Sequence, residues 1–307
     1  MGFVTGRARI AIMRQYSLFY QERVSLAIER IRKFAKLSAA MGYDVRVGFS
    51  GGKDSQVVYD LCKKSGIEFA AFYNTACESS ETRRFIRAHY PDVIWRQPYK
   101  VGFIKNIDVH RGMLPSVRAA YCCDNYKHNP KFVDNSSITG VRRDESAARS
   151  KRAVFESHGK RFDKAHDTQI AEYFTEKCRG IGSVGDIQLM PIVDWAENDV
   201  WEYIFREGLP VNPEYRHAKR VGCIICPKAN LTSNYYYLMK FPKLIDAVIR
   251  QREKHEVDWV ITSDGKDYSD NKPLYILRWL NHSFMPFSKK QEKLAEEILK
   301  RYNQTKK

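Results

Sequence analysis

The residues best suited to chemistry lie in one short segment, 50–55, which reads Ser-Gly-Gly-Lys-Asp-Ser. Its adjacent glycines allow positive φ angles and let the backbone approach a phosphate group closely. A helix beginning here would add free N–H groups and the positive end of its dipole. The segment therefore predicts a phosphate-binding loop, with a serine-capped glycine turn as the alternative. Its candidate residues are Ser50, Gly51, Gly52, Lys53, Asp54 and Ser55.

Asp54 is the unusual member of this loop, because a carboxylate is negative where an anion is expected to bind. Carboxylates are common ligands of Mg²⁺ beside phosphates, so Asp54 is suited either to orient the loop or to help hold Mg²⁺. The loop lacks the Gly-x-x-x-x-Gly-Lys-Ser/Thr spacing found in kinases and GTPases. We therefore expect a different class of phosphate site.

A basic pair, Arg142 and Arg143, follows the apolar segment 137–141, which reads as a strand. Doubly wound sheets place ligand-binding residues after their strands. Guanidinium groups bind phosphate or sulfate through two parallel hydrogen bonds, and the next residues, Asp144 and Glu145, are suited to orient them. The alternative is an exposed run of charges, and spacing alone does not separate the two.

The cysteines are seven in number, and an odd count with no secretion signal argues against a disulfide framework. Four of them form two close pairs, Cys122-Cys123 and Cys223-Ile-Ile-Cys226. Together the pairs provide the four thiolates of a zinc site or an iron–sulfur cluster, and adjacent cysteines are unusual for zinc. Four free thiols are the alternative. The isolated cysteines are expected to be small core or surface residues: Cys62, Cys77 and Cys178.

The elements that must position these groups alternate between strand and helix. Strand-like segments are expected at 45–49, 68–73, 93–95, 137–141 and 187–192, and helices at 16–40, 54–64, 81–89 and 199–207. This order predicts a doubly wound, mostly parallel α/β sheet. We divide the chain into an N-terminal helical segment (1–40), a nucleotide-binding domain that includes the paired cysteines (41–229) and a basic helical C-terminal region (230–307).

The chain of 307 residues has a formal net charge of +16, which favours an anionic partner. The excess is spread along the sequence, so a basic solvated surface is the alternative. No apolar run is long enough to span a membrane and no secretory signal is evident, so we expect a cytoplasmic protein without a membrane partner. Near the C-terminus, basic residues interleave with Tyr235, Tyr236 and Tyr237, an arrangement suited either to nucleic-acid contact or to core packing.

Several of these segments resemble one family. The segment 47–55 resembles the PP-loop of ATP pyrophosphatases and adenylylsulfate reductases, and Asn74-Thr75 resembles that family's second loop, which usually reads Asp-Thr-Gly. The segment 138–146 resembles a Thr-Gly-x-Arg-x-Asp-x-Ser element, and 221–227 resembles the family's Cys-x-x-Cys segment. From Val45 to Pro227 the chain is similar to the phosphoadenosine phosphosulfate (PAPS) and adenosine phosphosulfate (APS) reductase family.

This resemblance implies an adenine nucleotide alpha hydrolase-like fold and an adenine nucleotide ligand, either ATP or one of the sulfonucleotides APS and PAPS. It implies a [4Fe–4S] cluster on Cys122, Cys123, Cys223 and Cys226. It assigns catalytic roles to Lys53, Asp54, Arg142 and Arg143. Beyond the loop, the implied nucleotide-binding residues are Thr75, Thr139, Gly140, Arg142 and Arg143.

The sequence departs from the reductases at their nucleophile, a cysteine on a C-terminal Glu-Cys-Gly tail. No cysteine follows Cys226, and the usual sulfur-bound intermediate needs a thiolate. We therefore expect an ATP pyrophosphatase or adenylyltransferase in sulfur transfer to nucleic acid, assisted by a sulfur-donor protein. It would resemble the enzymes of DNA phosphorothioation and tRNA thiolation. A divergent reductase and a non-catalytic nucleotide-binding module of a nucleic-acid complex are the alternatives.

Overall fold

The computed structural model describes residues 19–127, 135–157, 160–162 and 187–306. These residues form two compact units. The first is drawn from the described parts of Met1–Asn74, Ser80–Arg96 and Phe132–Val221, and the second from those of Thr75–Ser79, Gln97–Lys131 and Gly222–Lys307. The units interleave along the chain. The division into the segments 1–40, 41–229 and 230–307 stays a prediction.

A sheet is the frame of the first unit. Among the described residues its strands lie in the order β3-β2-β1-β4-β7-β5-β6. Their bounds are β1 Arg46–Gly48, β2 Ala70–Asn74, β3 Ile94–Arg96, β4 Ser136–Ile138, β5 Phe155–Ser157, β6 Lys160–Phe162 and β7 Ile187–Leu189. The first five in this order pair in parallel, whereas β5 pairs antiparallel with both β7 and β6. The predicted α/β fold with a mostly parallel sheet is confirmed.

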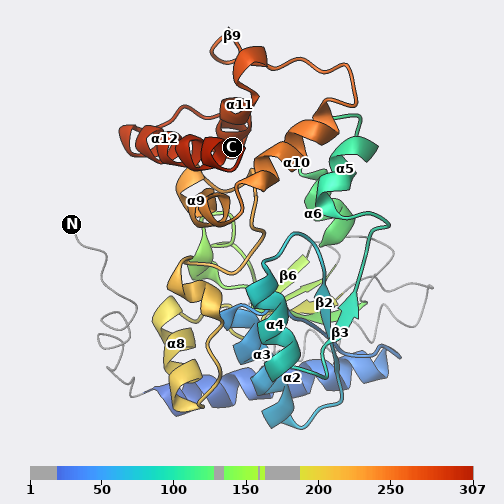
Figure 1. Ribbon diagram of the computed structural model, residues 1–307. Helices are drawn as coiled ribbons and strands as arrows, with labels where there is room; N and C mark the ends of the chain where they lie inside the picture. The colour runs from blue at the N-terminus through green and yellow to red at the C-terminus, as the bar shows by residue number, and fades with distance from the viewer. Residues whose placement is uncertain (1–18, 128–134, 158–159, 163–186, 307) are drawn as a thin grey trace. The chain divides into compact units, whose positions relative to one another are not determined.

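The helices of the first unit are α2 (Tyr20–Ala40), α3 (Lys53–Ser65), α4 (Ser80–His89) and α8 (Glu197–Arg206). Helix α2 buries a stripe at three- and four-residue spacing that includes Ala27, Ile31 and Phe34. Helix α3 ends at Gly66, which takes the left-handed conformation of a C-cap with φ of 71°. In Figure 1, α2 and α8 lie beside α3, and both pack on it.

The core of this unit lies along the central strands. Val47 in β1, Ile138 in β4 and Ile187 in β7 are fully buried. Parallel strands covered by helices on both faces of the sheet bury the side chains of both faces. Their sequences are therefore nearly continuous runs of apolar residues. The core fixes the ends of β1 and β4, and the loops that follow these two strands carry most of the predicted site.

The second unit is mainly helical, as predicted for the C-terminal region. Its helices are α5 (Phe103–Val109), α6 (Tyr121–Tyr126), α9 (Leu231–Lys240), α10 (Lys243–Arg252), α11 (Lys272–Trp279) and α12 (Lys289–Gln304), with a hairpin of β8 (Val260–Ile261) and β9 (Lys266–Asp267). They enclose a separate core around Trp279, Leu277 and Ile298. No helix within the described ranges is long and apolar enough to cross a membrane.

Candidate functional site

The loop 49–52 lies where the order of the sheet reverses. Strand β1 has β2 on one side and β4 on the other, so the chain leaves the centre of the sheet in opposite directions. Doubly wound sheets bind ligands at this point, outside the carboxyl ends of the strands. The loop after β1 leads directly into α3, which begins at Lys53, and the loop after β4 lies at the same edge.

Hydrogen bonds to serine side chains fix the conformation of the predicted phosphate-binding loop. Ser50 N–H donates to Ser55 Oγ across 3.1 Å, and Gly52 N–H donates to Ser50 Oγ across 3.3 Å. Gly51 has a φ of 72°, and a Cβ atom there would lie 2.9 Å from Ile86 Cδ1. Only glycine takes this conformation without strain, so the conformation of the loop requires glycine at position 51.

Gly140, after β4, makes a backbone contact with the start of α3. A Cβ atom at this position would lie 2.8 Å from both the carbonyl carbon and the carbonyl oxygen of Asp54. The preceding residue, Thr139, has a hydroxyl that is shielded from solvent and finds no hydrogen-bond partner among the described residues. The structure thus brings two of the predicted binding residues to the loop, and one of them keeps unused hydrogen-bonding capacity.

Three predicted catalytic residues meet at this point. Arg142 Nε donates to Asp54 Oδ1 across 2.6 Å, and Lys53 Nζ donates to Asp54 Oδ2 across 3.2 Å. Lys53 and Arg142 are only 5% and 2% exposed. Burial opposes the charge of Arg142, but the Asp54 carboxylate outweighs it and raises the pKa of the guanidinium. Two buried cations, Lys53 at the start of α3 and Arg142 after β4, therefore share the Asp54 carboxylate.

The two arginines of the basic cluster, Arg142 and Arg143, contact different residues. Beyond Asp54, Arg142 donates to the carbonyl of Trp195 across 3.2 Å, and its backbone N–H donates to Glu145. Arg143 Nε instead donates to the carbonyl of Arg152 across 2.7 Å. Arg142 therefore lies against the loop, and the catalytic roles of both arginines stay predictions.

Two residues that the sequence did not single out complete the loop. Asn212 Nδ2 donates to the carbonyl of Gly51 across 2.8 Å, and the Tyr215 hydroxyl accepts a hydrogen bond from Lys53 N–H across 2.7 Å. Both come from the segment after α8, at the 3₁₀-helix Pro213–Arg216. The only signal in the sequence was the Asn-Pro turn, which predicts a break in structure but no contact with a loop about 160 residues away.

The second unit contains Thr75 and the paired cysteines. Cys223 forms an antiparallel bridge with Glu78, and Ile224 N–H donates to the carbonyl of Cys77 across 2.8 Å. Asn234 of α9, 2% exposed, accepts a hydrogen bond from Cys226 N–H across 3.0 Å. The Cys-x-x-Cys segment is therefore held by its own unit. The nucleotide-binding role of Thr75 stays a prediction.

The thiols of the two pairs influence one another. A hydrogen bond with Cys123 raises the pKa of Cys122, and burial and the charges of Cys123, Cys223 and Cys226 raise it further. The same pairs raise the pKa of Lys127, with Cys223 as the largest cause. Within the described ranges, however, no group of three or more Cys, His, Asp or Glu side chains has a metal-binding arrangement. The structure thus gathers the thiols without the geometry of a formed metal site.

The other cysteines differ from these. Cys62 lies on α3 with no exposed surface, and burial raises the pKa of its thiol, as expected for a core residue. Cys178 lies outside the described residues. Among the tyrosines of α9, Tyr237 is 5% exposed and Tyr235 donates to Glu297, so both pack within their unit. This favours the core-packing alternative for that run.

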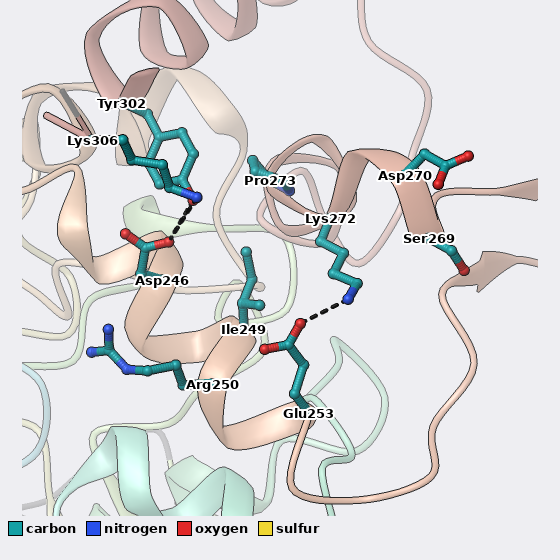
Figure 2. Close-up of a pocket in the computed structure, with 10 residues that line it drawn as sticks. All are labelled: Asp246, Ile249, Arg250, Glu253, Ser269, Asp270, Lys272, Pro273, Tyr302 and Lys306. Atoms are coloured by element: carbon teal, nitrogen blue, oxygen red, sulfur yellow. Dashed lines mark hydrogen bonds and ion pairs between the residues drawn. The ribbon is translucent and has the colours of Figure 1, made fainter. Parts of the chain in front are cut away.

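A pocket in the second unit lies between α10, α11 and the end of α12, and Figure 2 shows its lining. Its charged groups neutralise one another. Lys272 Nζ lies 2.7 Å from Glu253 Oε1, and Asp246 accepts a hydrogen bond from Tyr302. Lys306 Nζ lies 3.6 Å from Asp246 Oδ1. The pocket contains none of the predicted site residues and has no surplus of positive charge for a polyphosphate.

Comparison with known proteins identifies the family of this chain. The phosphoadenosine phosphosulfate reductase domain family matches residues 44–229, more than half of the chain. Sulfate adenylyltransferase subunit 2 of Brucella ovis is 25% identical over 216 residues, which cover 64% of this chain and 68% of that protein. An uncharacterised protein of Methanocaldococcus jannaschii is 29% identical over 231 residues, which cover 69% of this chain and 43% of that protein.

Among solved structures, a phosphate complex of PAPS reductase from Candida auris matches with a TM-score of 0.45 and 15% identity. That match covers 72% of this chain and 97% of the other. The segment matched by the family includes the loop, the basic cluster and both cysteine pairs.

Proposed function

This chain belongs to the phosphoadenosine phosphosulfate reductase domain family, and from that premise we propose that it transfers the adenylyl group of ATP to an acceptor and releases pyrophosphate. The observation that carries the proposal is the convergence of Lys53 and Arg142 on Asp54 at the start of α3. Buried cations at a helix N-terminus favour a group that develops negative charge. The family binds adenine nucleotides, so ATP, APS and PAPS are the candidate ligands.

In the proposed reaction an acceptor oxygen attacks the α-phosphorus of ATP. A new oxygen–phosphorus bond forms, the bond between the α-phosphorus and the bridging oxygen breaks, and pyrophosphate leaves with the electron pair. The positive end of the α3 dipole and the ammonium group of Lys53 bind the departing phosphates. Arg142, held by Asp54, stabilises charge at the α-phosphate. Asp54 also offers carboxylate oxygens for the Mg²⁺ that accompanies ATP.

For the acceptor we propose nucleic acid, in a sulfur-transfer reaction that also uses a sulfur-donor protein. The support is the formal net charge of +16. Excess positive charge attracts the phosphate backbone of a nucleic acid whatever its nucleotide sequence. Sulfate is the second candidate acceptor, because the Brucella relative is named a sulfate adenylyltransferase subunit. A PAPS or APS reductase and a non-catalytic nucleotide-binding module remain the two rival functions.

We further assign a [4Fe–4S] cluster to Cys122, Cys123, Cys223 and Cys226. Four thiols are the usual donor set of such a cluster, and adjacent cysteines fit it better than zinc. All four cysteines belong to the second unit, and this supports the assignment. When bound, the cluster supplies electron transfer or sulfur chemistry. The four cysteines would hold it, and Lys127 would offset its negative charge.

The test uses the whole chain purified without oxygen. ATP labelled at the α-phosphate is supplied with nucleic acid, with sulfate or with neither, and labelled AMP, adenylylated product and pyrophosphate are measured. Sulfite release from APS and PAPS is measured in parallel. Lys53→Ala should abolish product formation. Lys63→Ala is the matched control, because Lys63 lies at the far end of α3 and is 52% exposed. Sulfite release, or binding with no turnover under any condition, would reject the proposal.

A further inference from the structure

We propose that Tyr215 is a nucleotide-binding residue whose hydroxyl donates a hydrogen bond to a phosphate oxygen of the bound nucleotide. The inference rests on the proposed function, since it adds a donor to the same loop. The ligand class is a polyphosphate, either of a nucleotide or free pyrophosphate. The residue lies outside the loop and outside the basic cluster, on the 3₁₀-helix after α8.

The position of the hydroxyl is the first observation. It accepts a hydrogen bond from Lys53 N–H, the first N–H group of α3, across 2.7 Å. A Cβ atom at Gly52 would lie 3.4 Å from the same oxygen. The first N–H groups of a helix have no partner within the helix and point toward an approaching anion, so a hydroxyl bound to one of them lies where a phosphate would approach.

The unused proton of this hydroxyl is the second observation. A tyrosine hydroxyl both accepts and donates, and here its acceptor capacity is taken by Lys53. Among the described residues it donates to no acceptor. Burial raises the pKa of Tyr215, and the charge of Asp54 adds to this, so the group keeps its proton. Lys53 N–H polarises the hydroxyl and strengthens it as a donor to an anion.

The ring is fixed in place, which is the third observation. It meets Trp201 edge to face with centroids 5.0 Å apart, and Lys53 Nζ lies 5.9 Å from its centroid. Asn212 caps the same 3₁₀-helix by accepting from Glu214 N–H, and it also donates to the carbonyl of Gly51. The hydroxyl is therefore oriented before any ligand arrives, which lowers the entropic cost of binding.

The test is Tyr215→Phe in the full chain, with ATP, pyrophosphate and adenosine binding measured by calorimetry. A hydrogen bond to a charged group contributes enough that affinity for ATP and pyrophosphate should fall by roughly 10-fold or more. Affinity for adenosine, which carries no phosphate, should not change. Tyr203→Phe is the matched control, because that hydroxyl donates to Asp60 across 2.6 Å.

A purely structural role would give a different pattern. Asn212→Ala loosens the loop through Gly51 and should lower the melting temperature. Tyr215→Phe should instead leave the melting temperature unchanged and shift the phosphorus resonance of bound pyrophosphate. If the wild type binds ATP and the Phe variant binds it equally or more tightly, Tyr215 is not a donor, while the proposed function stands. If the wild type binds no phosphate ligand, both proposals fail.

Discussion

Arg142 Nε and Asp54 Oδ1 lie 2.6 Å apart, although 88 residues separate them in the chain. The contact joins the end of β4 to the start of α3, the two elements on which the proposed site depends. Because Arg142 is 2% exposed, its charge needs a partner, and the nearest carboxylate belongs to the loop itself. The same pair thus links the stability of the first unit to the shape of the site.

Removing the Asp54 carboxylate should therefore destabilise the chain. Asp54→Ala leaves Arg142 buried without its closest countercharge, and we expect the free energy of unfolding to fall by about 2 to 3 kcal/mol. Asp144→Ala is the control, because Asp144 is 56% exposed and lies 3.4 Å from Arg142 Nη1. It should change stability by about 0.5 kcal/mol or less. Urea denaturation measures both, and equal losses would contradict the central role of Asp54.

Gly140 should be required for the close approach of β4 to α3. In Gly140→Ala the new methyl group would meet the Asp54 backbone at 2.8 Å, and this backbone cannot move without shifting the loop. We expect the dissociation constant for ATP to rise by roughly 10-fold. In Gly48→Ala the nearest atom is Thr139 Cγ2 at 3.6 Å, an ordinary contact, so binding should be preserved. Unchanged ATP binding in Gly140→Ala would show that the close contact between Gly140 and Asp54 is not needed for nucleotide binding.

The sequence predicted those parts of the site that depend on local chemistry. The loop, the helix after it and the arginine after β4 are each encoded by adjacent residues. Asn212 and Tyr215 escaped prediction because their contacts with the loop join segments about 160 residues apart in the chain. The strands β5 and β6 were also missed, since they extend the sheet antiparallel within a polar segment that lacks strand alternation. The positions of these residues and strands depend on tertiary contacts, which a local sequence pattern does not predict.

The ion pair between Arg30 and Asp194 should make stability depend on pH. Burial tends to raise the pKa of Asp194, but the two hydrogen bonds from Arg30 outweigh it and lower that pKa. A carboxyl with a lowered folded pKa stabilises the protein above its unfolded value of about 3.9, and this contribution disappears as the pH falls through the folded pKa.

Asp194→Asn should then cost about 1 kcal/mol near neutral pH, a modest value because Asp194 is 40% exposed. The difference from wild type should vanish in acid. Urea denaturation across the acidic range measures it. Glu29→Gln serves as the control, because the Lys33–Glu29 pair is exposed and should contribute almost nothing at any pH. A difference that persists below the folded pKa would exclude this ion pair as the cause.

The cluster assignment predicts a brown protein that contains iron when purified without oxygen. Cys123→Ser and Cys226→Ser should each lose the visible absorbance and most of the iron, because each removes one of the four proposed ligands. Cys62→Ala should retain both, since Cys62 lies in the core of the other unit. Metal analysis and visible spectroscopy decide the question, and stoichiometric zinc without iron would replace the cluster with a zinc site.

The last prediction concerns the cysteines of these 307 residues, and it separates adenylyl transfer from sulfonucleotide reduction. A reductase must present a thiolate to the sulfur of APS or PAPS, and no cysteine follows Cys226 in the 307 residues. Cys62 is fully buried and its thiol pKa is raised, so it is a poor nucleophile. We therefore expect no sulfite from APS or PAPS with either thioredoxin or glutaredoxin as the reductant.

ATP should instead yield pyrophosphate at a rate that rises when the acceptor is present. A low rate without acceptor agrees with this, because an adenylating site that reacted freely with water would consume ATP without product. The decisive measurement is thus sulfite release. If it occurs at about 1 per second, an ordinary enzymatic rate, adenylyl transfer is the wrong assignment. Cys77→Ser would then be the first variant to make, since Cys77 lies beside the Cys-x-x-Cys segment and is partly exposed.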